Sequence, residues 1–374
     1  MKKKNTAIKK QKKIILFGLN GRGGMLHYTS QYANELSKLH QVYVVLPSYS
    51  RKDMFNKTVK IIKINAPPTI IGTIINSLNL IKIKNLIKCI KKIKPDILQF
   101  MDIHPFYLIY LLFLKKETKY STIHDVKLHS GENKGITSII TILIQKSLFK
   151  YSKKLIVHGE KQKKDLISLK VKSKKIIVVP HGTYEFFTKW KQNKNKLEKN
   201  TILFFGRIIK YKGVDNLLKS MEFVIKQKTD VNLIIAGEGN FQQYSKYLTK
   251  KINKNVTVLN RYIPEEEVAA IFQKCCFVVL PYDDATQSGI IPIAYSFKKP
   301  VITTNVGSLS EVVDQNKTGI IIPPKSPKKL SEAILTMFKK NTTKMGENAY
   351  TKMKQMMDWN LIITKIFDEP EFKK

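Results

Sequence analysis

The stretch TILFFGRIIKYKGVDNLL, residues 201–218, decides the fold of this chain. Its apolar run stops at Gly206, and two cations, Arg207 and Lys212, stand five residues apart before a helical pattern begins. A glycine turn between a strand and a helix places both cations at one helix N-terminus, where backbone N–H groups and the helix dipole favour anions. Arg adds a planar fork and Lys a compact charge. The stretch therefore predicts a diphosphate site between a strand and a helix.

The same alternation of short β-branched runs with helical patterns continues in both directions along the chain. Upstream runs begin near residues 14, 41, 59, 96, 120, 154 and 175, and downstream runs near 201, 231, 255, 275, 299 and 319. Such alternation predicts βα units and parallel sheets. At 374 residues the chain also exceeds what one core usually organises. We therefore expect an α/β protein with two doubly wound, Rossmann-like domains.

A polar segment without strand periodicity, residues 182–200, marks the boundary between the two domains. The prediction is a first domain over 1–185, a second domain over 186–355, and a helix over 356–374 that crosses back onto the first domain. In parallel sheets of this kind, ligands bind at the carboxyl ends of the strands. Side chains that follow the strands are therefore the candidates for a site in a cleft between the domains.

The net charge of +39 comes almost entirely from lysine, because only four of the 67 basic residues are arginine. Proteins that read bases or phosphates specifically rely on arginine. We interpret the charge as a compositional bias, and an anionic membrane surface is the main alternative. No run approaches the roughly 20 apolar residues that span a bilayer. The short apolar run at 14–19, after a basic start, predicts a first strand rather than a signal peptide.

The three cysteines, Cys89, Cys275 and Cys276, have no metal-ligand spacing and form no CxxC pair. We interpret them as small buried side chains in a protein of a reducing compartment.

Two candidate sites follow strands of the first half. Gly23 and Gly24, after the first strand, let a phosphate or a sugar approach the backbone closely, although such a turn is often only structural. His124, next to Asp125, ends the strand YSTI and can hydrogen-bond a ligand near neutral pH. The alternative is a strand-end His beside an Asp that caps a turn.

The remaining histidines and the paired acids receive structural interpretations. His27 is expected to be a polar residue of the first helix, and His158 and His181 are assigned turn and hinge roles. Asp283 is interpreted as a cap of its loop. A second anion-ready helix start lies just beyond that loop, at the serine and glycine of PYDDATQSG, although an ordinary N-cap has the same pattern.

These features together resemble the retaining glycosyltransferases of family 4, which have the GT-B architecture of two facing Rossmann-like domains. FFGRIIKYKGVDNLL is similar to the donor-diphosphate block of that family, and LIIAGEG, RYIPEEEVAAIFQKCCFVVLPY and PVITTNVGSLSEVVDQNKTGIIIPP follow in the usual order. In the first half, GRGGMLHY looks like the glycine loop and STIHD like the strand-end His. The resemblance covers nearly the whole chain.

The resemblance implies roles for particular residues. Arg207 and Lys212 would hold the donor diphosphate and stabilise the departing nucleotide, and His124 would contact the transferred sugar. The other implied donor-binding positions are Gly23, Gly24, Tyr262, Ile263, Asp284, Gln287, Ser288, Gly289 and Ile290. Among them, the loop at Tyr262 and Ile263 would face the base. The resemblance implies no bound metal and no other cofactor.

The sequence departs from the family pattern at one motif. Many members carry two Glu residues eight positions apart before the strand that starts with Pro-Val, one for the sugar and one for the ribose. Those positions are Ala285 and Ile293 here, in the variant PYDDATQSG of a subgroup, and Asp284 would partly replace the first acid.

The expected function is a cytoplasmic sugar transferase that moves a hexose-like unit from a nucleoside-diphosphate donor to an acceptor hydroxyl with retention. The acceptor is expected to be a saccharide or a lipid-linked molecule, in the synthesis of cell-surface polysaccharide or glycolipid. The lysine-rich apolar segments of the first half suggest peripheral binding to the inner face of the plasma membrane. A silent sugar-nucleotide-binding module is the alternative. A nucleic-acid-binding protein is disfavoured because arginine stripes and stacking platforms are absent from the sequence pattern.

Overall fold

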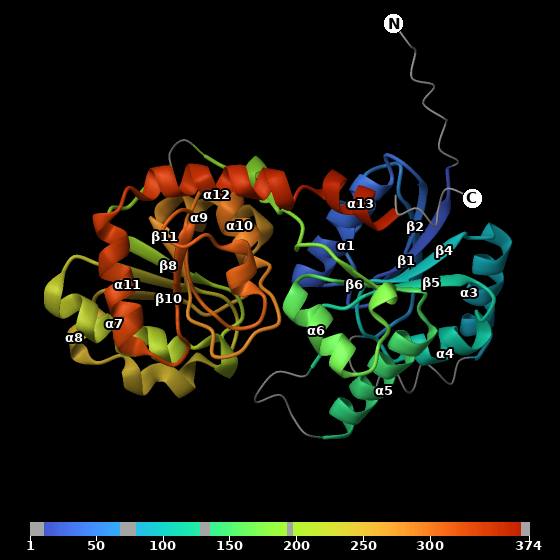
Figure 1. Ribbon diagram of the computed structural model, residues 1–374, viewed down its shortest axis with the longest axis horizontal. Helices are drawn as coiled ribbons and strands as arrows, with labels where there is room; N and C mark the ends of the chain where they lie inside the picture. The colour runs from blue at the N-terminus through green and yellow to red at the C-terminus, as the bar shows by residue number, and fades with distance from the viewer. Residues whose placement is uncertain (1–10, 68–79, 128–134, 193–196, 368–374) are drawn as a thin grey trace, which may run out of the picture.

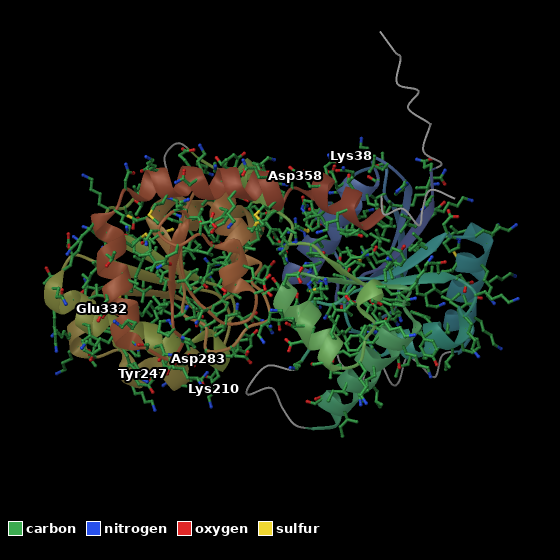
Figure 2. All side chains as sticks on the ribbon, viewed as in Figure 1. Lys38, Lys210, Tyr247, Asp283, Glu332 and Asp358 are labelled. Atoms are coloured by element: carbon green, nitrogen blue, oxygen red, sulfur yellow. The ribbon has the colours of Figure 1, made fainter. Side chains whose placement is uncertain are left out.

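The computed structural model describes residues 11–67, 80–127, 135–192 and 197–367. They form two α/β domains side by side, each built on a parallel sheet that helices cover (Figure 1). Nitrogen-tipped side chains project around the outline of both domains, as the high lysine content predicts (Figure 2). Among the helices of the described residues, none is long and apolar enough to cross a membrane.

The first domain contains a seven-stranded parallel sheet in the order β3-β2-β1-β4-β5-β6-β7. Its strands are β1 (Lys13–Phe17), β2 (Gln41–Pro47), β3 (Lys60–Ile64), β4 (Ile97–Phe100), β5 (Thr118–Thr122), β6 (Lys154–Val157) and β7 (Ile176–Val178). The helices are α1 (Gly23–Leu36), α3 (Leu80–Ile93), α4 (Phe106–Phe113), α5 (Ile136–Tyr151) and α6 (Glu160–Ser168), with a short 3₁₀ helix η1 (Ser173–Lys175).

The second domain contains a six-stranded parallel sheet in the order β10-β9-β8-β11-β12-β13. Its strands are β8 (Thr201–Phe205), β9 (Asn232–Ala236), β10 (Val256–Leu259), β11 (Phe277–Leu280), β12 (Val301–Thr304) and β13 (Gly319–Ile322). The helices are α7 (Val214–Gln227), α8 (Lys250–Asn253), α9 (Glu265–Lys274), α10 (Ile290–Ser296), α11 (Pro327–Lys339) and α12 (Thr342–Met356), with 3₁₀ helices η2 (Glu185–Trp190), η3 (Lys210–Lys212), η4 (Phe241–Tyr247) and η5 (Leu309–Val312). Every strand predicted from the β-branched runs is present, and the prediction of two Rossmann-like domains is confirmed.

Helices cover both faces of the first sheet, because successive residues of a strand point to opposite sides. Ile14 and Leu16 of β1 pack in the layer of α1, whereas Ile15 and Phe17 pack in the layer of α3, α4 and α5. The strands are therefore apolar on both sides, which explains their continuous β-branched runs. The glycine loop and helix α1 lie at the end of this sheet that faces the second domain (Figure 1).

The chain passes between the domains twice, and the two crossings are bonded to each other. The N–H of Thr183 donates to the carbonyl of Met357 at 3.0 Å, and Nε1 of Trp359 donates to the carbonyl of Thr183 at 2.9 Å. Gly182 lies so close to the Trp359 ring that a Cβ there would come within 2.3 Å of it. The two crossings therefore form one connection between the domains.

The predicted C-terminal helix crosses back onto the first domain, and it begins three residues after the predicted residue 356. Helix α12 ends at Met356, and α13 (Trp359–Phe367) begins after Asp358, whose Oδ1 accepts the N–H of Asn360 at 3.0 Å. That contact stabilises a new helix start. Helix α13 buries its apolar face against the first-domain core beside α1. Residues 368–374 lie outside the described residues.

The predicted domain boundary at residue 185 falls on the first residue of η2, between the two sheets. The interpretation of the cysteines is corrected in part. Cys275 is buried and Cys276 is half-buried, but Cys89 is exposed on α3, so it is not a buried side chain. All three are free thiols.

Candidate active site

Loops from three strand ends meet where the domains face each other. In each sheet the strand order reverses beside the first strand, so that β1 lies between β2 and β4, and β8 between β9 and β11. Loops diverge at such a switch point and leave a crevice for a ligand. The glycine loop follows β1, Arg207 and Lys212 follow β8, and the PYDDATQSG loop follows β11. The topology therefore brings most of the predicted site residues to one region.

The turn after β8 requires glycine at both ends. Gly206 has a φ of +120°, and Gly213, which precedes α7, has a φ of +68°. A Cβ on Gly213 would lie 2.0 Å from the carbonyl oxygen of Pro281, at the start of the neighbouring loop. Side chains rarely adopt such backbone angles, and no space is left for one here. The glycines therefore fix how the two cations point.

Lys212 is held by an aromatic side chain that sequence analysis did not select. Its Nζ donates to Oη of Tyr282 at 2.8 Å and lies 4.3 Å from the centre of the Tyr282 ring. Tyr282 is almost fully buried. A positive charge over a ring face is favourable. The ammonium group is thus positioned before any ligand arrives.

The surroundings of Lys212 lower the pKa of its ammonium group. Burial, together with the nearby positive charge of Arg207, lowers the pKa of Lys212 to about 7, although the negative charge of Asp125 acts in the opposite direction. Asp125 belongs to the first domain and follows His124. The two cations of the second domain therefore lie within electrostatic range of the loop after β5.

Arg207 is exposed, and among the described residues it forms no ion pair with a carboxylate. Its guanidinium therefore retains the capacity to bind an anionic ligand. Arg207 and Lys212 are close enough for their charges to repel each other. A diphosphate between them would remove that repulsion.

The loop after β11 completes the second-domain side. Ser288 Oγ accepts the N–H of Ile290 at 3.2 Å, at the start of α10. Gln287 Oε1 is buried and, among the described residues, has no hydrogen-bond partner. Asp283 Oδ1 accepts Nδ2 of Asn216 at 2.7 Å, which agrees with the interpretation of Asp283 as a structural acid. Ala285 and Ile293, which occupy the positions of the missing acids, are both buried.

Neutral histidines line the first-domain side. The rings of His124, His158 and His181 surround Tyr28, with centroid distances of 4.7, 5.4 and 5.0 Å. Each imidazole has one nitrogen beside a backbone carbonyl, and burial lowers the pKa of all three, that of His181 to about 3. Two polar atoms inside this cluster, Tyr28 Oη and His158 Nε2, have no partner among the described residues. The turn and hinge roles predicted for His158 and His181 therefore did not include their packing with His124 around Tyr28.

The glycine loop reaches this cluster and the second domain. Tyr184 Oη lies 3.5 Å from the carbonyl of Gly24, and a Cβ on Gly289 would lie 3.5 Å from Nε2 of His181. A Cβ on Gly23, whose φ is +50°, would meet no atom within 4 Å. The structure therefore brings Gly24, His181 and Gly289 together, with open space beside Gly23.

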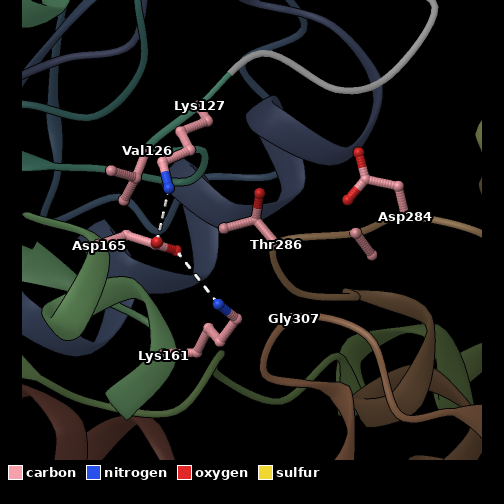
Figure 3. Close-up of a pocket in the computed structure, with 8 residues that line it drawn as sticks. Val126, Lys127, Lys161, Asp165, Asp284, Thr286 and Gly307 are labelled. Atoms are coloured by element: carbon pink, nitrogen blue, oxygen red, sulfur yellow. Dashed lines mark hydrogen bonds and ion pairs between the residues drawn. The ribbon is translucent and has the colours of Figure 1, made fainter.

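A pocket of about 210 Å³ opens beside the loop of His124 (Figure 3). The first domain contributes Val126, Lys127, Lys161 and Asp165, and the second contributes Asp284, Ala285, Thr286 and Gly307. Lys127 Nζ and Asp165 form an ion pair at 2.8 Å on its first-domain side. Asp284 and Ala285 therefore lie where two domains form one cavity.

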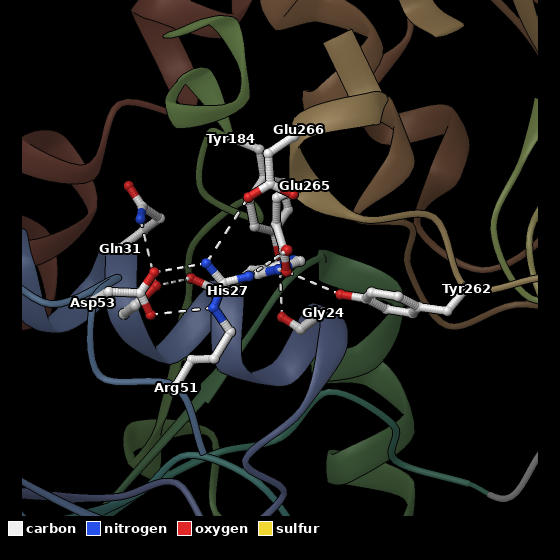
Figure 4. A network of polar contacts seen from close by, with 10 residues as sticks. Gly24, His27, Gln31, Arg51, Asp53, Tyr184, Tyr262, Glu265 and Glu266 are labelled. Carbon is white, nitrogen blue, oxygen red and sulfur yellow. Dashed lines mark hydrogen bonds and ion pairs between the residues drawn. The ribbon is translucent and has the colours of Figure 1, made fainter. Parts of the chain in front are cut away.

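A polar network on Glu265 joins the domains beside Tyr262 (Figure 4). Glu265, at the start of α9, bonds Nε2 of His27 at 2.8 Å, Nη1 of Arg51 at 2.8 Å and Oη of Tyr262 at 2.9 Å. The hydrogen bond from His27 is the main cause that lowers the pKa of Glu265 to about 2. Ile263 is buried beside the half-exposed Tyr262. His27 is therefore an interdomain contact rather than an ordinary polar residue of α1.

A second interdomain contact involves Glu311. Its carboxylate accepts the N–H groups of Glu160 and Lys161 at 2.8 and 3.0 Å, at the N-terminus of α6. Sequence reasoning missed Tyr282, Glu265 and Glu311, because their partners are far away along the chain. A partial signal existed for Glu265, which opens the acidic run EEE at a helix start. No group of three or more His, Cys, Asp or Glu side chains within the described ranges could hold a metal ion.

Two family models match the chain. The model described as "Glycosyl transferases group 1" matches residues 185–352, and the model "Glycosyltransferase Family 4" matches residues 22–184. The chain is a glycosyltransferase of the GT-B type. The family resemblance of the motifs is thereby confirmed at this level.

Known relatives and solved structures agree with this glycosyltransferase assignment. An uncharacterized glycosyltransferase of Methanocaldococcus jannaschii is 22% identical over 92% of the chain and 95% of the relative. The capsular polysaccharide biosynthesis glycosyltransferase CapM of Staphylococcus aureus is 26% identical over 54% of the chain, which spans 56% of CapM. Sucrose-phosphate synthase of Thermosynechococcus elongatus has a TM-score of 0.74 at 17% identity, with coverage of 95% and 97%. HepE of Anabaena, solved in complex with UDP-glucose, has a TM-score of 0.71 at 16% identity, with coverage of 96% and 100%.

Proposed function

We propose that this glycosyltransferase moves a hexose unit from a nucleoside-diphosphate donor to an acceptor hydroxyl, with retention at the anomeric carbon. The observation that carries the proposal is the pair Arg207 and Lys212, positioned after β8 and close enough to repel each other. Cleavage of the donor leaves negative charge on the diphosphate, and preorganised cations stabilise that charge in the transition state. The pair is suited to this step more than to any other in glycosyl transfer.

The roles of the remaining residues follow from their positions. Tyr282 orients Lys212, and the backbone amides of Ser288, Gly289 and Ile290 together with Gln287 would bind phosphate oxygens. Gly23 and Gly24 would admit the donor, and Tyr262 with Ile263 would contact the base. His124, neutral because burial lowers its pKa, would orient the sugar rather than act as the main base.

The donor and the acceptor are proposed from chemistry and from relatives. HepE was solved with UDP-glucose, which supports uridine nucleotides as the first donors to examine. The name of CapM supports an acceptor in polysaccharide synthesis, either a saccharide or a lipid-linked molecule. The proposed site of action is the cytoplasm. Since Arg207 and Lys212 supply the positive charge, we propose that transfer needs no bound metal.

A second candidate is a silent module that binds a sugar nucleotide without transferring the sugar. Ala285 and Ile293 favour this candidate, because the family resemblance implies acids at these positions, whereas both side chains are apolar and buried here. Asp284, in the adjacent pocket, is the acid available to compensate.

Purified protein incubated with a panel of uridine, guanosine and thymidine diphosphate sugars separates the candidates. Release of nucleoside diphosphate, slow by hydrolysis and faster with an acceptor, is expected for the enzyme. Binding without release in the presence of acceptor extracts would support the silent module. The anomeric configuration of the product, read by NMR coupling constants, tests retention. Turnover that persists in EDTA is expected, whereas turnover abolished by EDTA and restored by Mg²⁺ would contradict metal independence.

A further inference from the structure

The outer surface of helices α4 and α5 is unusually apolar. Five large side chains there point into solvent: Leu112 (60% exposed), Phe113 (55%), Ile139 (58%), Ile142 (39%) and Leu143 (51%). The two helices pack against each other and lie on the side of the first sheet away from α1 and α13 (Figure 1). We refer to these five residues as the α4–α5 surface. Gathered apolar side chains of this kind mark an interaction site.

The fold itself does not require this surface. Helix α4 reads FYLIYLLF and contains no charged residue, and its inner side chains, Phe106, Tyr107, Tyr110 and Leu111, already fill the core. In α5, Ile144 and Leu148 face the core in the same way. A surface helix normally presents polar residues on its outer side. Packing of the first-domain core therefore does not explain the five apolar side chains of the α4–α5 surface.

Lysines surround the α4–α5 surface. Exposed lysines follow α4 at Lys115 and Lys116, and others lie on the last turns of α5 at Lys146 and Lys150. The outer side of α3, in the same layer, carries Lys84, Lys88, Lys91 and Lys92. Acids are scarce here: residues 80–116 contain only Asp96 and Asp102, and α5 contains none. The charge next to the apolar side chains is therefore strongly positive.

We propose that the α4–α5 surface docks the enzyme on an anionic lipid bilayer. Apolar side chains that enter the headgroup region, next to lysines that attract anionic lipids, are the two contributions that bind an interfacial helix. A second copy of the chain would bring the same lysines face to face, and a nucleic acid would not use the apolar side chains. Helix α5 begins at Ile136, nine residues after Lys127 of the pocket. A bilayer at this surface would therefore hold the domain that supplies the first-domain side of the pocket.

The test is flotation of the full chain with lipid vesicles. The protein should float with phosphatidylcholine vesicles that contain phosphatidylglycerol, remain unbound with phosphatidylcholine alone, and dissociate as salt rises. The variant Ile139→Ser/Ile142→Ser/Leu143→Ser should lose binding. Reversal of charge in Lys88→Glu/Lys92→Glu should weaken partitioning by roughly fivefold or more per lysine, on the scale of one lysine at an anionic surface.

Matched variants of the second domain serve as controls. Leu197→Ser/Phe223→Ser removes exposed apolar side chains, and Lys250→Glu/Lys251→Glu makes the same change in net charge. Both should bind vesicles as the unchanged protein does, and all variants should keep the unchanged melting temperature and rate of donor hydrolysis. Equal loss of binding in the control pair would attribute binding to net charge and overturn the proposal. So would unchanged binding in the triple serine variant, or an α4–α5 surface that mediates a dimer and binds no vesicle.

Discussion

Two clusters near the candidate site, one from each domain, differ in charge, whereas the pocket between the domains takes Lys127, Lys161 and Asp165 from the first domain. The second-domain side carries Arg207 and Lys212, two cations that lie within range of each other. The first-domain side carries His124, His158 and His181, which are neutral near pH 7 because burial lowers their pKa values. The difference indicates a division of labour. On the proposed function, the second domain would stabilise the leaving diphosphate, and the first domain would orient uncharged parts of the substrates.

The largest effect is expected from loss of a cation. Lys212→Ala should lower turnover at least about a hundredfold, since a preorganised charge stabiliser is lost. Lys212→Arg restores the charge and should recover part of the rate. The equivalent change on the opposite side, His124→Ala, should be milder. Steady-state kinetics with saturating donor makes the comparison, and an equal loss in both variants would contradict the division of labour.

The next effect concerns the contact that holds the two sides together. Glu265→Ala removes one partner from His27 and Arg51 across the domains, and the buried His27 ring loses its bond to the carboxylate, whereas Arg51 keeps Asp53. We expect the donor KM to rise about tenfold or more, with kcat changed less. Glu266→Ala is the matched control, because Glu266 Oε1 lies 4.0 Å from Arg51 and its side chain is exposed. A similar change in both variants would show that the Glu265 network does not set the donor KM.

A pH dependence distinguishes the two sides further. With a pKa of about 7, Lys212 is partly neutral in the free enzyme, and a diphosphate would favour its charged form. Donor binding should therefore take up a proton above pH 7. As the pH rises above 7, affinity for the donor should fall by at most about tenfold per pH unit. Isothermal titration in buffers of different ionisation enthalpy measures the uptake. The uptake should vanish in Lys212→Met and persist in His124→Ala.

The smallest effect is expected from Tyr282→Phe. This change removes the oxygen that accepts from Lys212 but keeps the ring beneath the ammonium group. The expected loss of turnover is about fivefold, the scale of one hydrogen bond of about 1 kcal/mol. Tyr244→Phe, which alters a buried tyrosine away from the cations, should leave the rate unchanged. A loss in Tyr282→Phe as large as in Lys212→Ala would give Tyr282 a direct role.

The sequence was sufficient to predict the strands and the turn after β8, because both depend on local patterns. Every strand was marked by its own β-branched run, and the pair Gly206 and Arg207 sits directly at a strand end. The boundary predicted before residue 356 lies close to the break between α12 and α13, and the helix start differs by three residues because Asp358 caps α13 at Trp359. Cys89 was misjudged because its exposure depends on which side of α3 faces the sheet.

The contacts between domains could not be read from the sequence. Glu265 meets His27, which is 238 positions away, and no local pattern links them. Tyr282 reaches Lys212 over 70 positions because β8 and β11 are neighbours in the sheet. The PYDDATQSG loop was found by motif, but its buried Gln287 oxygen required the three-dimensional structure. The sequence therefore predicted site residues that directly follow a strand, but it did not predict their hydrogen-bond partners from distant parts of the chain.

The most direct test of the leaving-group role is turnover of Arg207→Ala under saturating donor, with donor affinity measured separately by titration. If Arg207 stabilises charge that develops during cleavage, kcat should fall at least about a hundredfold while affinity for the donor changes much less. Full kcat in folded Arg207→Ala protein would contradict the account.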